Sequence, residues 1–188
     1  MSRARCRHCG QNVGAFYPAI ELAALIVAAW STAIASGWSL AASCLLGWVL
    51  LALTFTDIRI FLLPDFLTLP LIGSGLLVTQ ALEPSTTLPH ILGAAIGFLA
   101  IVAIRKAYWM LRGREGIGLG DAKLMAAAGA WVSWEGLPSV LLIATMGGLT
   151  SALLRHYRTA AIRATDRVAF GAFLCVGIWL VWLYGPLV

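Results

Sequence analysis

An aspartate within residues 116–131 is the first candidate for chemistry. This stretch runs Gly-Ile-Gly-Leu-Gly-Asp-Ala-Lys-Leu-Met-Ala-Ala-Ala-Gly-Ala-Trp, so Asp121 follows three alternating glycines and precedes a run apolar enough to enter a bilayer. Ionisable groups at membrane depth are costly and usually functional. Glycines let another backbone approach closely, so a peptide substrate would fit beside Gly118 and Gly120. The alternative is that the glycines form a turn and Asp121 only caps the next helix.

Two more carboxylates flank a turn earlier in the chain. Asp57 and Asp65 are eight residues apart, with Pro64 between them and apolar segments on both sides. Asp65 has a sufficient structural role as the N-cap of a helix that starts at Phe66. Asp57 is therefore the stronger candidate for a partner of Asp121.

A Cys-x-x-Cys pair near the amino terminus is a candidate set of metal ligands. Cys6 and Cys9 would supply two thiolates of a tetrahedral zinc site, and Gly10 suits the tight turn around a metal. The other two ligands are not evident, because Cys44 and Cys175 lie in apolar segments. Zinc at this pair would need a partner or a second copy of the chain, and a pair without metal is the open alternative.

The elements that position these residues are predicted to be membrane-spanning helices. The 188 residues are 61% hydrophobic and 11% charged, with a mean hydropathy of +0.90, which leaves too few polar residues to cover a soluble globule. A spanning helix needs about 20 apolar residues, and continuous rather than alternating apolar runs favour helices over a barrel. We predict an all-α polytopic bundle of about seven transmembrane helices, at 18–37, 38–56, 66–82, 88–104, 121–134, 137–154 and 168–183.

The positive charges indicate the topology. All 13 lysines and arginines lie in alternate connections of the bundle, at 3–7, 59, 105–114, 123 and 155–167. Cytoplasmic loops of membrane proteins carry an excess of such residues, so these connections and the amino terminus are predicted to face the cytoplasm. The net charge of +5 is then a topology signal and an attraction to membrane lipid, and no nucleic-acid partner is expected.

The chain divides into two parts on this basis. Residues 1–17 are polar and basic and form a cytoplasmic segment with the Cys-x-x-Cys pair, and residues 18–188 form the transmembrane domain. No removable signal peptide is expected, because no cleavage site follows a short apolar core.

Seven spans place Asp57 and Asp121 on the same face of the membrane. Two carboxylates that share a low-dielectric site cannot both be ionised, so such a pair holds a single proton. The ionised member would take a proton from water as that water attacks a scissile carbonyl, while the protonated member polarises the carbonyl. If the two side chains meet, the sequence predicts aspartyl proteolysis.

Both stretches also resemble a known family. Residues 118–131 read Gly-x-Gly-Asp-x-Lys-Leu-x-Ala-x-x-Gly-Ala-Trp, which is similar to the signature of the type IV prepilin peptidase family, intramembrane aspartyl proteases of the Gly-x-Gly-Asp class. Residues 63–70, Leu-Pro-Asp-x-Leu-Thr-Leu-Pro, are similar to a second pattern of that family, and the resemblance covers nearly the whole chain. It implies that Asp57 and Asp121 are catalytic and that the active-site loops contain Gly118, Gly120, Lys123, Pro64 and Asp65.

Three residues near these motifs have open roles. Ser133 stands where the family usually has a glycine, which should affect helix packing more than chemistry. Ala172 replaces the proline of a Phe-Gly-Pro motif, so helix geometry at that end is expected to differ. Lys123 either favours ionisation of Asp121, binds lipid phosphate or only marks the cytoplasmic side.

The resemblance also implies a substrate, a reaction and a location. Prepilins and pseudopilins carry a short basic leader, which this family cuts after a glycine just before the hydrophobic helix. The chain would then be a multi-pass endopeptidase of the bacterial inner membrane, with its site at the cytoplasmic face and no cofactor for the peptidase reaction. Methylation of the new amino terminus by S-adenosylmethionine, the family's second activity, is expected to be missing, because these 188 residues lack the corresponding segment.

Other functions remain open from the sequence. A preflagellin or Flp-type prepilin peptidase shares the aspartate pair, although a Cys-x-x-Cys before Tyr17 and Pro18 favours the prepilin type. A transporter or proton relay would use the same pair to carry protons, and a non-catalytic pilus-assembly subunit would need no reaction at all. The sequence does not determine which pilin is processed or whether copies of the chain form a homo-oligomer.

Overall fold

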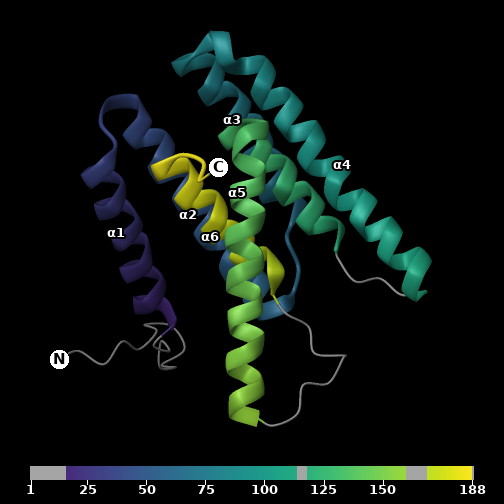
Figure 1. The fold of residues 1–188 in the computed structure, drawn as a ribbon. Coiled ribbons are helices and arrows are strands. Elements are labelled where there is room, and N and C mark those ends of the chain that lie inside the picture. Colours follow the sequence, from purple (N-terminus) through teal and green to yellow (C-terminus); the bar gives the residue numbers. More distant parts are fainter. Residues whose placement is uncertain (1–15, 114–117, 160–168, 188) are drawn as a thin grey trace, which may run out of the picture.

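Helices make up all regular structure in the residues that the structure describes. The computed structural model describes residues 16–113, 118–159 and 169–187. Its elements (Figure 1) are α1 (Phe16–Ile34), α2 (Gly37–Ile60), α3 (Asp65–Leu82), the 3₁₀ helix η1 (Pro84–Thr86), α4 (Thr87–Arg112), α5 (Leu119–Thr159) and α6 (Phe170–Tyr184). The all-α class predicted from the continuous apolar runs is confirmed.

Most of these helices are long and apolar enough to cross a membrane. Five candidates meet that criterion by length and composition among the described residues: α1, α2, α3, η1 with α4, and α5 counted once. Helix α6 is shorter, at 15 residues. Leu25, Leu77 and Met146 are among many large apolar side chains that are more than half exposed, as expected for surfaces in lipid. A multi-pass membrane protein follows, whereas the count of seven crossings stays a prediction.

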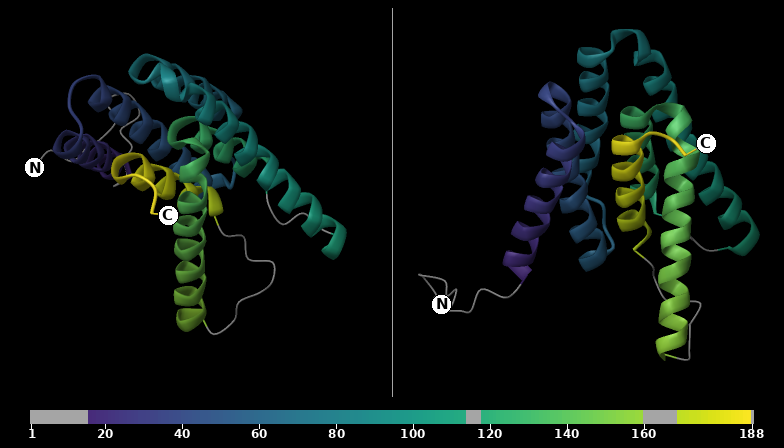
Figure 2. Two further views of the ribbon diagram at one scale, coloured as in Figure 1. Left: turned by 45° about the horizontal axis from the view of Figure 1, so that its top comes forward. Right: turned by 60° about the vertical axis from the view of Figure 1, so that its left-hand side comes forward.

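Helix α5 reverses direction at Ser133. The backbone there has φ 61° and ψ 179°, a conformation that costs a residue with a side chain about 1–3 kcal/mol. Figures 1 and 2 show a first arm of α5 that runs upward and a second arm that runs back down past the other helices. The Ser133 hydroxyl accepts a hydrogen bond from the Glu135 N–H at 3.3 Å and so caps the second arm. The arms correspond to the predicted spans 121–134 and 137–154.

Glycines bring α4 and α5 into close contact, and these two helices form the most extensive packing of the bundle. A Cβ on Gly93 would lie 2.7 Å from the Gly129 carbonyl oxygen, and a Cβ on Gly97 would lie 2.5 Å from the Met125 carbonyl oxygen. Only residues without a side chain allow backbones to approach this closely. The glycines of α4 therefore account for its close packing against α5.

Trp131 holds the first arm of α5 against α3 and α6. The side chain is 1% exposed, and its Nε1–H donates to the Leu71 carbonyl of α3 at 2.8 Å. Its ring meets Trp182 of α6 edge-on, with 5.1 Å between the centroids, a preferred aromatic geometry. The arm that begins beside Asp121 is thus held by α3, α4 and α6 together.

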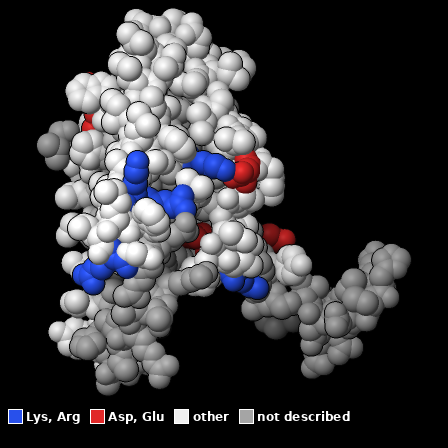
Figure 3. Space-filling model, turned by 90° about the vertical axis from the view of Figure 1, so that its right-hand side faces the viewer, with Lys and Arg blue, Asp and Glu red and all other residues white. Residues whose placement is uncertain are grey.

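The described basic side chains lie in the last turn of α2, in the second half of α4 and near the start of α5. Arg59 is in the last turn of α2, Arg112 is in the last turn of α4 and Lys123 follows the start of α5. On the face shown in Figure 3, the Lys and Arg side chains lie at mid-height and the upper part carries none. This one-sided distribution agrees with the alternate basic connections predicted from the sequence.

Candidate active site

Asp57 lies inside α2 rather than after it. The helix continues to Ile60, where Phe61 takes a left-handed conformation (φ 52°, ψ 36°) and donates its N–H to the Asp57 carbonyl at 2.9 Å, a common way for a helix to end. The predicted end of this span at Thr56 is therefore wrong by about one turn. Asp57 is 6% exposed, so its carboxylate is held within the bundle.

The amino-terminal end of α6 points at the Asp57 carboxylate. The Ala172 N–H donates to Asp57 Oδ2 at 2.9 Å, and the Gly171 N–H also donates to this carboxylate. In the first turn of a helix, no helical carbonyl can accept from such groups, and Ala169 before the turn supplies no side-chain cap. Asp57 thus caps α6 from another helix, and the positive helix end stabilises the charge of the carboxylate.

Asp121 lies in the first turn of α5. This helix begins at Leu119, so Asp121 is its third residue and not its N-cap. The carboxylate accepts a hydrogen bond from the Gly118 N–H, as the third residue of a capping box does. An ionised carboxylate has about four acceptor positions, so this contact leaves others for a reaction.

The two aspartates come together from the ends of two different helices. Asp57 and Asp121 are close enough to interact electrostatically. The buried thiol of Cys175, one turn after Gly171 in α6, interacts electrostatically with both carboxylates. The site therefore combines the end of α2 with the first turns of α5 and α6, and its two acidic groups share one apolar environment.

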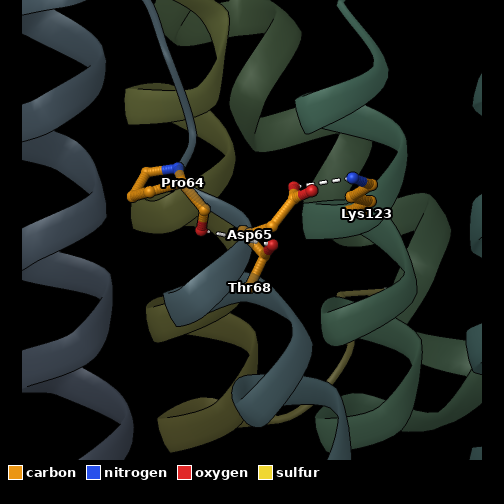
Figure 4. Close-up of polar contacts among 4 residues, drawn as sticks. All are labelled: Pro64, Asp65, Thr68 and Lys123. Carbon is orange, nitrogen blue, oxygen red and sulfur yellow. Dashed lines mark hydrogen bonds and ion pairs between the residues drawn. The ribbon is translucent and has the colours of Figure 1, made fainter.

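Asp65 has a different position from the one predicted. The N-cap of α3 is Pro64, which has no side-chain cap, and Asp65 is the first helical residue. Its carboxylate is 59% exposed and pairs with Lys123 Nζ at 2.6 Å (Figure 4), while the Pro64 carbonyl accepts from the Thr68 hydroxyl at 3.4 Å. The predicted N-cap role of Asp65 is wrong, because α3 begins at Asp65 itself and the side chain pairs with Lys123 on α5.

The glycines before Asp121 differ in what surrounds them. A Cβ on Gly118 would meet only ordinary contacts, with Asp121 Oδ2 at 3.7 Å. A Cβ on Gly120 would lie 2.9 Å from the Leu63 Cβ. The close approach predicted at these glycines for a substrate is thus made at Gly120 by a side chain of the same protein.

The candidate zinc ligands Cys6 and Cys9 lie outside the described residues. Across residues 16–113, 118–159 and 169–187, no group of three or more His, Cys, Asp or Glu side chains is arranged to hold a metal ion. Zinc at the Cys-x-x-Cys pair stays a prediction.

Sequence reasoning did not identify the role of α6. Gly171 and Ala172 were noted only for a motif and its missing proline, yet their N–H groups hold Asp57. The sequence feature that could have indicated this contact is Gly171, the glycine that follows Phe170. A Cβ on Gly171 would lie 2.9 Å from Asp57 Oδ2 and 3.1 Å from its Cγ, so this position has no room for a side chain.

Replacing Gly171 with alanine is expected to lower activity at this site by about 100-fold, because displacing a reacting group by an ångström can cost that much. Gly148→Ala is the matched control: a Cβ there would meet only Phe170 and Phe173 side-chain atoms at 3.9 Å. Turnover of both variants, normalised to folded protein, measures the effect. Equal activity of the two variants would show that Asp57 does not need its present position.

The sequence of this chain is similar to those of one known protein family. The model of the type IV leader peptidase family matches residues 44–153. A prepilin leader peptidase/N-methyltransferase of Aeromonas hydrophila is 39% identical over 188 residues, covering 97% of this chain and 63% of that protein. A protein of the same name in Burkholderia pseudomallei (strain 1026b) is 43% identical over 177 residues, covering 93% of this chain and 57% of that protein. This chain thus spans less than two thirds of these relatives' length. No solved structure gave a significant match.

Proposed function

Because the chain belongs to the type IV leader peptidase family, we propose that it is an intramembrane aspartyl endopeptidase with Asp57 and Asp121 as its catalytic pair. The observation that carries this proposal is that both carboxylates reach one apolar site from separate helices. Leu63 packs against Gly120, next to Asp121, and against Gly171, which adjoins Asp57, and the two carboxylates are close enough to interact electrostatically. Ion pairs or caps would explain each aspartate alone. Neither explains why two like charges are kept together in a membrane protein.

The reaction follows from a pair that shares one proton. The ionised carboxylate accepts a proton from a water molecule as the water oxygen attacks the carbonyl carbon of the scissile bond. The protonated carboxylate donates a hydrogen bond, and then its proton, to the carbonyl oxygen. Collapse of the tetrahedral intermediate breaks the C–N bond: one of its hydroxyl groups returns a proton to the pair, the amine leaves with the proton that the pair took from water, and the pair again holds a single proton. The N–H groups of Gly171 and Ala172 keep Asp57 oriented throughout.

Prepilins and pseudopilins are the proposed substrates. The relatives are named as prepilin leader peptidases, and a basic leader next to a hydrophobic helix would place its scissile bond at a membrane interface. Asp57 lies in the last turn of α2 together with Arg59, and Asp121 lies in the first turn of α5, two residues before Lys123. Under the positive-inside rule the end of the bundle with these two basic residues faces the cytoplasm, which puts the site at the cytoplasmic face of a bacterial inner membrane.

Several finer expectations belong to this proposal. They are seven crossings with a cytoplasmic amino terminus, a division into residues 1–17 and 18–188, and a peptidase reaction without a cofactor. The relatives' names include an N-methyltransferase, and the expectation that residues 1–188 do not catalyse methyl transfer stays a prediction. Zinc at Cys6 and Cys9, and assembly of copies of the chain, are likewise untested.

Cleavage of a tagged prepilin is the direct test. Vesicles that contain the 188-residue chain are expected to convert the precursor to a shorter product, and vesicles without it are not. Mass spectrometry of the product locates the cut, and labelled S-adenosylmethionine in the same reaction detects methyl transfer. No cleavage of any tested prepilin would contradict the proposal. A proton flux across the same vesicles, read with a pH-sensitive dye, would then favour a relay, and its absence a non-catalytic subunit.

A further inference from the structure

The segment between α2 and α3 lies beside the aspartate pair. Leu63 Cδ1 lies 3.0 Å from the position that a Cβ on Gly171 would take, and Asp57 Oδ2 lies 2.9 Å from the same position. The same side chain also adjoins α5, because Leu63 Cβ and Cδ1 lie 2.9 and 3.3 Å from the position of a Cβ on Gly120. One leucine side chain therefore fills the space between the first turns of α5 and α6, beside the carboxylates.

Both ends of this segment are held in place. At its start, the Phe61 N–H donates to the Asp57 carbonyl at 2.9 Å. At its end, the ion pair between Asp65 and Lys123 ties the start of α3 to α5. Leu63 itself packs against the hydrophobic core. The core packing of Leu63 and the hydrogen bond at Phe61 make this side chain part of the site wall, and the exposed ion pair adds a weaker restraint.

The substrate residue before the scissile bond is the one that this wall would meet. Its carbonyl carbon must reach both carboxylates at once, so the Cα bonded to that carbon comes closest to the groups around the pair. Gly120 and Gly171 already lack side chains on either side of Leu63. A substrate residue packed against the same leucine would have as little room for a Cβ as these two glycines have, which would account for the glycine that the family resemblance implies before the scissile bond.

We propose that Leu63 is a specificity-determining residue, which selects glycine immediately before the scissile bond by filling the space that a side chain there would need. The inference rests on the proposed peptidase function and deepens it. A well-packed apolar wall discriminates against one additional methyl group by about 10- to 200-fold, because room for it would require displaced side chains or backbone. Truncation of Leu63 would create that room.

Two prepilins that differ only in glycine or alanine before the scissile bond test this proposal. They are mixed and cleaved by vesicles with wild-type protein, Leu63→Ala or Leu62→Ala, and the ratio of the two products gives the ratio of kcat/KM. Leu62 is the matched control, because it lies in the same segment but is 63% exposed. Leu63→Ala is expected to lower the preference for glycine by about tenfold or more, and Leu62→Ala to leave it unchanged.

The outcomes separate this inference from the function on which it rests. Cleavage of the glycine substrate with the same ratio in Leu63→Ala as in wild type overturns the inference alone, and so does an equal rise in both rates, which would make Leu63 a movable cover. If Leu63→Ala does not cleave, the ratio is measured with Leu63→Val, where a loss of preference of severalfold is expected and no change overturns the inference. No cleavage by wild type overturns the proposed function and this inference with it.

Discussion

Asp57→Asn and Asp121→Asn are each expected to reduce prepilin cleavage by about 10²- to 10⁴-fold, the usual contribution of a general acid or base. Asparagine can neither take a proton from the attacking water nor transfer one to the carbonyl oxygen, because its amide does not titrate in water. The fold should survive, because the asparagine oxygen can still accept from the Ala172 N–H that now reaches Asp57 Oδ2. Initial rates of cleavage in vesicles, at equal amounts of folded protein, measure the effect.

The double variant distinguishes a shared proton from two independent groups. Residues that act as one unit show strongly non-additive losses, so Asp57→Asn with Asp121→Asn is expected to be about as inactive as either single variant. A loss that equals the product of the two single losses would mean that the carboxylates act separately, which would contradict the shared site.

Asp65→Asn is the control for loss of a carboxylate near the site. Asp65 is 59% exposed and pairs with Lys123, and exposed ion pairs contribute about 0–1 kcal/mol. A decrease of about fivefold at most is therefore expected. Loss of activity in Asp65→Asn with activity retained in Asp57→Asn would reverse the choice between these two aspartates.

The helical class could be predicted from the sequence because lipid leaves few solutions. Continuous apolar runs must satisfy their backbone groups internally, and helices do this within one segment. Ends of helices were harder to predict. Asp57 was expected just outside a span, yet α2 extends to Ile60, because a left-handed residue such as Phe61 can end a helix without a glycine to signal it.

The candidate site shows the difference between local and distant contacts. The spacing of charged loops predicted that Asp57 and Asp121 share one face, and the two carboxylates do interact. The cap preference of aspartate suggested a role for Asp65 that its pairing with Lys123 replaces, and no local pattern reveals a partner on another helix. The same holds for the contact from α6 to Asp57.

Two departures from the family pattern acquire a physical meaning in the structure. Ala172 has an N–H that donates to Asp57, which a proline at this position could not do. Alanine in place of proline at position 172 therefore adds a hydrogen bond to the Asp57 carboxylate, in addition to any change in helix geometry. Ser133 takes φ 61° at the turn within α5, a conformation that glycine adopts without strain. Its effect is on that turn, where the serine hydroxyl supplies a cap in return.

Gly129→Ala is expected to have the largest effect on stability. A Cβ at this position would overlap the carbonyl group of Gly93 and lie 2.5 Å from the Ala94 nitrogen. These are backbone atoms of α4, so no side-chain rotation relieves the clash and the helices must separate. Overpacking costs about 1–3 kcal/mol, occasionally more. Because this clash involves backbone atoms, we expect a cost at the upper end, which exceeds the gain of about 1 kcal/mol that alanine brings to a helix. Thermal unfolding in detergent micelles measures the difference.

Gly73→Ala is the control, and its expected effect on stability has the opposite sign. Gly73 lies within α3 and has no atom within 4 Å of its Cβ position, so Gly73→Ala should be neutral or slightly stabilising. Gly129 and Asp121 are on the same arm of α5, so a shift of that arm away from α4 also moves Asp121 relative to Asp57. Gly129→Ala should therefore lose cleavage activity even at temperatures where it remains folded. Equal stability and activity of the two variants would mean that the contact between α4 and α5 can yield without disturbing the aspartate pair.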